Sequence, residues 1–222
     1  INTDSVYRKV HCFKHAKVFR SDVQAICDSL VYNSKDSCMT MYKDPIAWNT
    51  DRQILGEVIK VYLQDSTVRE AHVIGQALSI ELMPDKKHYN QLSSKVITTY
   101  FVKGNVRRVV ASGNVKTIYY PVDDKDSTLQ GLVYTETDTM KLYISPERKL
   151  QKIWTPKNES VMYPMTQIPP NKYKLPEFAW FDNLRPTGPE DVFLWRGKGD
   201  NNKLKPVGRK KAPLQNIANI EK

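Results

Sequence analysis

The feature that most restricts the fold of this chain is a frame that recurs four times along the sequence. It runs Tyr, five residues, an apolar residue, two residues, another apolar residue, three residues, and then Gly or Pro. Copies begin at Tyr32, Tyr62 and Tyr100, and a copy with one extra residue begins at Tyr143. Starting points 30, 38 and 43 residues apart are typical of a supersecondary unit repeated with loops of variable length. The remaining frame positions are Cys38, Met41, Pro45; Val68, Ala71, Gly75; Val106, Val109, Gly113; and Leu150, Ile153, Lys157–Asn158.

Each copy predicts a β-hairpin followed by a corner. The stretches that lead into the tyrosines, such as EVIKVYL and KVITTYF, are rich in β-branched and aromatic residues. The segments after each Tyr, such as NSKDS and LQDST, carry turn residues. One stretch, SDVQAICDSLVY, has Val23, Ile26 and Leu30 at helical spacing, but its place in the repeat favours a strand. We therefore expect an all-β fold.

Because alternate residues of a strand point to opposite faces, the frame also predicts an apolar interior opposite the repeated tyrosines. The members of this interior that we expect to contact a ligand are Ile59, Val61, Leu63, Val73, Ile97, Phe101, Val109, Met140, Leu142, Ile144 and Ile153. An ordinary antiparallel sandwich, which packs its own core and binds nothing, is the alternative interpretation of the pattern.

The composition changes near Tyr163. Prolines at 164, 169, 170, 176, 186 and 189, with five aromatic residues between Phe178 and Trp195, cannot continue a set of repeated hairpins. We expect residues 1–163 to form the β-domain and 164–197 to form a capping or docking segment, with a short helical turn at PEFAWFDNL. Residues 198–222 are predicted to be a basic, disordered tail.

Most of the net charge of +10 lies near the C-terminus. Between Arg196 and Lys211 seven basic residues face one acid, Asp200, a balance of 7 − 1 = +6 that leaves 10 − 6 = +4 for the remainder. Nucleic acid is therefore an unlikely partner of the β-domain, although the tail keeps it as a third hypothesis. No apolar run approaches the ~20 residues of a membrane-spanning helix, so no transmembrane segment is predicted.

No motif for catalysis or for a metal is present, and we expect neither an enzyme nor a cofactor. His11, Cys12 and His15 lie close together, but no second pair at metal-ligand spacing follows. Three cysteines, Cys12, Cys27 and Cys38, allow one bridge and one free thiol. We treat them as small buried apolar residues.

Three short motifs carry a family resemblance. VVASGNVKTIYY (Val109 to Tyr120), AHVIGQALSIE (Ala71 to Glu81) and LGEVIKVYL (Leu55 to Leu63) resemble the repeat of the OstA-like family, the class of LptA and of the N-terminal domain of LptD. The resemblance covers roughly residues 6–163. It departs from the family at Asp44-Pro45, at Lys157-Asn158 and in the C-terminal extension.

The resemblance implies a jelly roll of stacked antiparallel hairpins that forms an open V-shaped groove. It also implies a non-enzymatic periplasmic protein that binds the acyl chains of lipopolysaccharide or lipid A and pairs with other OstA-like domains through edge strands. Lys60, Arg69, Arg107 and Arg108 are our candidates for the phosphates of the headgroup. The alternative function is that of a scaffolding β-protein with a closed core and no lipid ligand.

Overall fold

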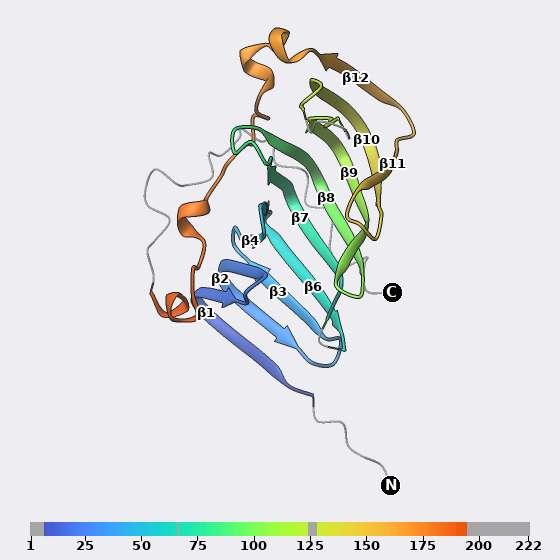
Figure 1. Ribbon diagram of the computed structural model, residues 1–222. Helices are drawn as coiled ribbons and strands as arrows, with labels where there is room; N and C mark the ends of the chain where they lie inside the picture. Colours follow the sequence, from blue (N-terminus) through green and yellow to red (C-terminus); the bar gives the residue numbers. More distant parts are fainter. Residues whose placement is uncertain (1–6, 66, 124–127, 195–222) are drawn as a thin grey trace.

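The computed structural model describes residues 7–65, 67–123 and 128–194, and in these ranges it is built almost entirely from β-strands (Figure 1). Twelve strands pair antiparallel in one sheet. None of the helices in the described ranges is long and apolar enough to cross a membrane. The strands are β1 (Lys9–Phe19), β2 (Val23–Asn33), β3 (Cys38–Tyr42), β4 (Ile46–Asn49), β5 (Arg52–Leu55), β6 (Val58–Gln64), β7 (Thr67–Leu82), β8 (Tyr89–Val102), β9 (Asn105–Tyr119), β10 (Leu132–Ile144), β11 (Leu150–Trp154) and β12 (Asn158–Tyr163).

The four hairpins predicted from the frame are confirmed: β2 pairs with β3, β6 with β7, β8 with β9, and β10 with β11. The stretch with helical spacing is strand β2, because its pairing with both β1 and β3 outweighs the spacing of Val23, Ile26 and Leu30. The all-β, jelly-roll-like fold of stacked antiparallel hairpins is thus present.

The sheet is folded along a line of corners into two arms. Register shifts interrupt the long strands there, for example between Ile74 and Ala77 in the pairing of β7 with β8. The first arm holds β3, β6 and β11, and the second arm holds β4, β5 and β12, while β2, β7, β8, β9 and β10 contribute to both. Residues of both arms, such as Ile97 and Leu92, pack in one buried cluster, so the arms face each other.

Pairs of consecutive residues with left-handed backbone make the corners. They are Lys14-His15, Lys43-Asp44, Gly75-Gln76 and Gly113-Asn114. Two successive left-handed residues bend a strand sharply, and glycine adopts this conformation at no steric cost. The predicted corner at Lys157-Asn158 is different: neither residue has a positive φ, and the chain passes from β11 in the first arm to β12 in the second through a loop.

We expect Gly113→Ala to lower the free energy of unfolding by more than Gly104→Ala does. Both glycines have positive φ (79° and 75°), where an L-residue costs about 1–2 kcal/mol. A Cβ at Gly104 meets nothing within 4 Å, whereas a Cβ at Gly113 lies 2.7 Å from Cδ of Lys95. Denaturant unfolding of both variants measures the difference, and an equal or smaller loss for Gly113→Ala would contradict the corner packing.

Two apolar clusters form the core. The inner cluster lies between the arms and includes Ile59, Val73 and Ile97. The outer cluster lies between the outer face of the second arm and residues 164–194, which we call the strap. In Figure 1 the strap runs along the β-structure from the end of β12 toward β1. Ile168, Leu175, Phe181 and Leu184 of the strap are buried against the Trp48 side of the second arm.

Three glutamines hold the strap across the strands. Gln24 (β2), Gln53 (β5) and Gln91 (β8) lie in one cross-strand row with Trp48 and Ile80. Gln91 accepts a hydrogen bond from the Leu175 amide (2.8 Å) and donates to the Tyr173 carbonyl (2.9 Å). Gln53 accepts from the Phe181 amide (2.7 Å) and donates to the Ala179 carbonyl (2.7 Å). The sheet therefore satisfies backbone groups of the strap that have no ladder of their own.

The strap is less helical than its sequence suggests. Of the helical turn predicted over residues 176–184, a 3-10 turn forms at Asp182–Leu184, and the other 3-10 turns lie at Met165–Gln167, Pro170–Lys172 and Pro189–Phe193. Between the turns the strap backbone depends on the glutamines instead.

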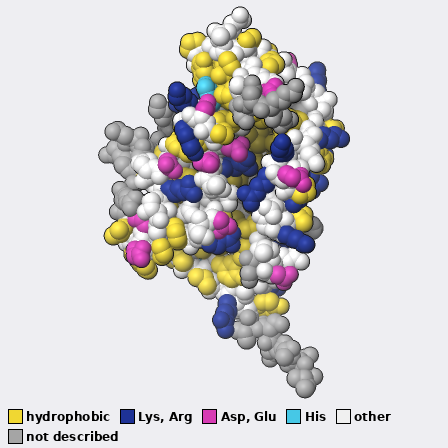
Figure 2. Space-filling view, viewed as in Figure 1, with side chains coloured by type: hydrophobic (Ala, Val, Ile, Leu, Met, Phe, Trp, Pro, Cys, Tyr) yellow, Lys and Arg dark blue, Asp and Glu magenta, His cyan; other side chains and the backbone are white. Residues whose placement is uncertain are grey.

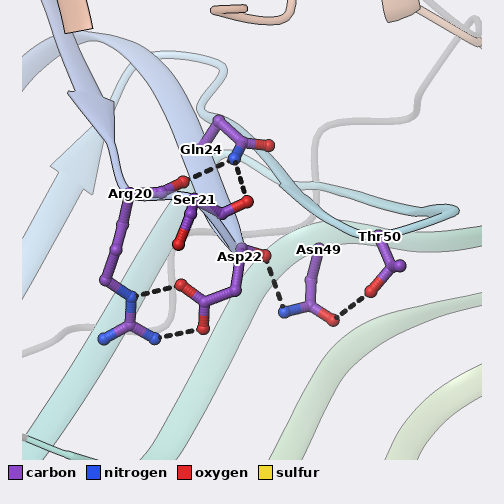
Figure 3. Close-up of polar contacts among 6 residues, drawn as sticks. All are labelled: Arg20, Ser21, Asp22, Gln24, Asn49 and Thr50. Carbon is purple, nitrogen blue, oxygen red and sulfur yellow. Dashed lines mark hydrogen bonds and ion pairs between the residues drawn. The ribbon is translucent and has the colours of Figure 1, made fainter. Parts of the chain in front are cut away.

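The strap is further anchored at the turns that join β1 to β2 and β4 to β5. Figure 3 shows Gln24 donating to the carbonyls of Arg20 and Ser21, and Asn49 donating to the carbonyl of Asp22. Arg185 of the strap donates to Oε1 of Gln24 and to the Thr50 carbonyl, at 2.7 Å each. Both functional ends of the Gln24 amide are used, so this side chain joins the β1–β2 turn to the strap. Asn49 and Arg185 join the β4–β5 turn to the same assembly.

Gln91→Met is expected to loosen the strap. It removes the acceptor of the Leu175 amide and the donor to the Tyr173 carbonyl. Leaving a buried polar group unpaired costs about 1–3 kcal/mol. We expect a lower free energy of unfolding and faster proteolysis within the strap. Gln151→Met, on exposed strand β11, is the matched control and should change neither measurement. Equal behaviour of the two variants would show that the glutamine contact does not hold the strap.

Candidate functional site

The pairing register places the apolar residues predicted to line the interior on one face of the first arm. They fall in three rows parallel to the line of corners. The corner row is Met41, Ile59, Val73, Ile97, Ala111 and Met140. The middle row is Met39, Val61, Ala71, Thr99, Val109, Leu142 and Ile153. The tip row is Leu63, Val68, Phe101, Val106, Ile144 and Leu150.

Burial decreases from the corner row to the tips of the hairpins. Every residue of the corner row is buried. In the middle row Val109 is buried, Val61 and Leu142 are half-buried, and Ile153 is 48% exposed. In the tip row Phe101 and Ile144 are half-buried and Leu150 is exposed. The apolar interior is therefore closed at the corner and accessible at the tips.

The second arm presents small and hydroxyl-bearing side chains to this interior. Ala25 and Ala77 belong to the inner cluster, and Ala47 packs against it. In register with Ala47 lie Ser79, Thr117 and Thr135 on β7, β9 and β10. The same row also contains Ile54 and Leu92, so this wall mixes short side chains with longer aliphatic ones.

A surface pocket of about 270 Å³ lies at the tips of the β6–β7 and β8–β9 hairpins. Its lining combines apolar Val68 and Phe101 with the cations Arg69 and Lys103 and the acid Asp65. Phe101, predicted to contact acyl chains, and Arg69, predicted to bind the headgroup, thus line the same pocket. The arrangement can hold an apolar group and an anion side by side.

The four headgroup candidates are not brought together. Arg69 lines the pocket. Lys60 and Arg108 lie in register with His72 and Tyr100 on the outer face of the first arm, opposite the apolar rows. Arg107 donates to the carbonyls of Val106 (3.2 Å) and Ser145 (3.1 Å).

Sequence reasoning missed Lys103. Its position in the hairpin turn, two residues after Phe101 and directly before Gly104, was the available signal, because residues at the tip of one hairpin can line the same opening.

Burial raises the pKa of several phenols above the ordinary tyrosine value, which already leaves them uncharged at neutral pH. Burial, together with the neighbouring Tyr173 and Asp85, raises the pKa of Tyr120 to about 12. Burial, followed by Cys38, also raises the pKa of Tyr62. Burial and the hydrogen bond to Glu136 raise the pKa of Tyr134. Each of these phenols therefore remains a neutral hydrogen-bonding group at neutral pH.

Within the described ranges no group of three or more His, Cys, Asp or Glu side chains could hold a metal ion. All three cysteines are free thiols. Cys27 and Cys38 are buried as predicted, but Cys12 is exposed because β1 is an edge strand that packs on β2 alone along its first half.

Both edges of the sheet expose apolar side chains. At one edge Val10 and Phe13 of β1 are exposed, and at the other edge Trp154 of β11 and Met162 of β12 are exposed. Figure 2 shows hydrophobic side chains at the surface toward both ends of the molecule, among basic and acidic ones. Unpaired backbone groups and apolar side chains at a sheet edge favour pairing with another strand.

Neither a family model nor a curated protein sequence matches the chain. Among solved structures, the chain is similar to LptH, the LptA-homologous periplasmic component of the lipopolysaccharide transport device of Pseudomonas aeruginosa, with 14% sequence identity and a TM-score of 0.48. The match covers 64% of this chain and 95% of LptH. Membership of the OstA-like family stays a prediction.

Proposed function

We propose that this chain is a non-enzymatic lipid-binding protein that holds acyl chains of lipopolysaccharide or lipid A between its two arms. The observation that carries the proposal is the decrease in burial along the three apolar rows, from a closed corner to accessible tips. Val61, Leu142 and Phe101 offer apolar surface at the accessible end. Each methylene that they remove from water contributes ~0.8 kcal/mol.

The pocket at the hairpin tips supports an anionic amphiphile as the ligand. Phe101 and Val68 contact the beginning of the acyl chain, while Arg69 and Lys103 bind phosphate through charge-assisted hydrogen bonds. This proposal retains Arg69 from the predicted headgroup set and adds Lys103.

The exposed edges support transfer along a series of similar domains. An OstA-like domain, or a second copy of this chain, adds a strand to β1 or to β11 and extends the apolar rows from one domain to the next. Such a relay suits the periplasm, where lipopolysaccharide must cross an aqueous space.

A scaffolding protein with a closed core is the second candidate. The completely buried corner row favours it, since Ile59, Ile97 and Met140 pack without a ligand. The two candidates differ in whether the middle and tip rows contact lipid.

Photocrosslinking tests the lipid site with a matched control at each position. A photoreactive residue at 61, 101 or 142 is expected to label lipid A, which has no polysaccharide chain, because these positions face the interior. The same residue at 60, 100 or 141, one position earlier on the same strand, faces outward and should label at background level. Equal labelling of inner and outer positions, or none at either, would refute the lipid site and favour the scaffold.

His11→Pro tests edge pairing. The Ser34 amide donates to the Arg8 carbonyl, so the alternation of an antiparallel ladder leaves the His11 amide facing the free edge. We expect the variant to keep the thermal unfolding midpoint of the unmodified chain but to self-associate at least ten-fold more weakly in sedimentation experiments. Pairing between copies through β1 would be refuted if His11→Pro self-associates as strongly as the unmodified chain. It would also be refuted if the unmodified chain stays monomeric at every concentration.

A further inference from the structure

The outer face of the first arm carries a basic and aromatic surface that, apart from Arg69 at its border with the tip pocket, the proposed lipid function does not use. We call it the outer strip. Its residues are Lys60, Tyr62, Arg69, Glu70, His72, Tyr100, Arg108, Lys141, Tyr143, Lys152 and Trp154, all half-buried or exposed. The corresponding face of the second arm is covered by the strap, whereas these side chains remain accessible.

The strip is straight because it follows the pairing register. One row runs Tyr62, Glu70, Tyr100, Arg108, Tyr143 and Lys152 across β6 to β11. The row beside it contains Lys60, His72, Lys141 and Trp154. With neighbouring strands about 4.8 Å apart, the five steps from β6 to β11 give a strip about 24 Å long and two rows wide.

The charge of the strip is unbalanced. Five cations (Lys60, Arg69, Arg108, Lys141 and Lys152) accompany a single acid, Glu70. Glu70 is already engaged with His72 at 2.7 Å. Within the described part of the chain none of the five cations forms an ion pair, in contrast to Lys43 with Asp28 and Arg52 with Glu81 elsewhere on the surface. Their charge is available to a ligand.

Aromatic rings position the cations instead. The Arg108 guanidinium lies 4.0 Å from the centre of the Tyr100 ring, and Nζ of Lys141 lies 4.5 Å from that of Trp154. Lys152 and Arg69 lie 5.9 Å from the rings of Tyr143 and Tyr62. A cation over a ring loses conformational freedom but keeps its charge unneutralised. The strip is thus an ordered set of donors rather than a set of free lysines.

We propose that the outer strip binds an extended anionic polysaccharide. The three tyrosines lie two strands apart, about 10 Å from one to the next, which is close to the length of a disaccharide unit in an extended glycan. Sugar rings stack on aromatic side chains, and Arg108 and Lys152 follow Tyr100 and Tyr143 in the row, where the acidic group of each unit falls. A narrow, linear strip fits one extended chain better than a broad membrane surface.

Apart from Arg69, which also lines the tip pocket, this surface lies on the opposite side of the sheet from the apolar rows. The variants that test the strip leave Arg69 unchanged, so the proposal stands independently of lipid binding. Failure of the lipid crosslinking experiment would not contradict the outer strip. Failure of the polysaccharide experiment below would not contradict the lipid site.

The test measures binding of a hyaluronan octasaccharide, which carries one carboxylate per disaccharide, by calorimetry at low salt. K60Q/K141Q/K152Q is expected to weaken binding at least ten-fold. The control K87Q/K172Q/K174Q removes the same charge and two cation–aromatic contacts, those of Lys172 with Tyr134 and Lys174 with Phe178, away from the strip. It is expected to bind within two-fold of the unmodified chain. Thermal unfolding verifies that both variants fold.

Two further comparisons identify the ligand class. Y143S/W154S keeps every cation and is expected to lose at least five-fold in affinity, because stacking is removed. Uncharged N-acetylchitohexaose, oligo(dT) and phosphatidylglycerol vesicles are expected to bind more weakly than hyaluronan. Equal weakening by both lysine triples, no effect of the aromatic variant, or tighter binding to oligo(dT) or to vesicles would each overturn the proposal.

Discussion

The left-handed corner pairs are the constraint on which the rest of this structure depends. A strand as long as β7 or β9 would otherwise continue straight and leave its apolar face exposed. The bends at Gly75-Gln76 and Gly113-Asn114 return each strand toward the other arm. Because these bends are aligned across the sheet, they produce a single inner cluster rather than isolated kinks. The accessible tips are a consequence, since rows farther from the corner have less of the opposite arm to pack against.

The second arm differs from the first because both of its faces are covered. Its inner face contributes alanines, Leu92 and Val115 to the inner cluster, and its outer face packs Trp48 and Leu55 under the strap. The first arm has only its inner face buried, which leaves its outer face to the cations and rings of the outer strip. One continuous sheet thereby supplies two surfaces of opposite chemistry, apolar inside and basic outside.

The repeated frame predicted the hairpins and the apolar face because both follow from alternation and turn residues within about fifteen neighbouring positions. The site was harder to predict. Lys60 and Arg69 are near in sequence, yet a bulge beside Tyr62 places them in different surroundings. The position of such a register shift cannot be predicted from the amino-acid composition of the strands. The prolines predicted a separate segment after Tyr163, but the path of the strap depends on glutamines 82 to 161 residues away. Polar residues inside strands gave no local signal of that role.

Those separations also determine when the strap can form during folding. Gln24, Gln53 and Gln91 come into line only after β2, β5 and β8 have joined the same sheet. Closing loops of such length is entropically costly until the row already exists, so strap docking follows sheet assembly rather than nucleating it. In a newly made chain Trp48 and Ile80 therefore stay uncovered until the strap, which follows all twelve strands in the sequence, has been synthesised.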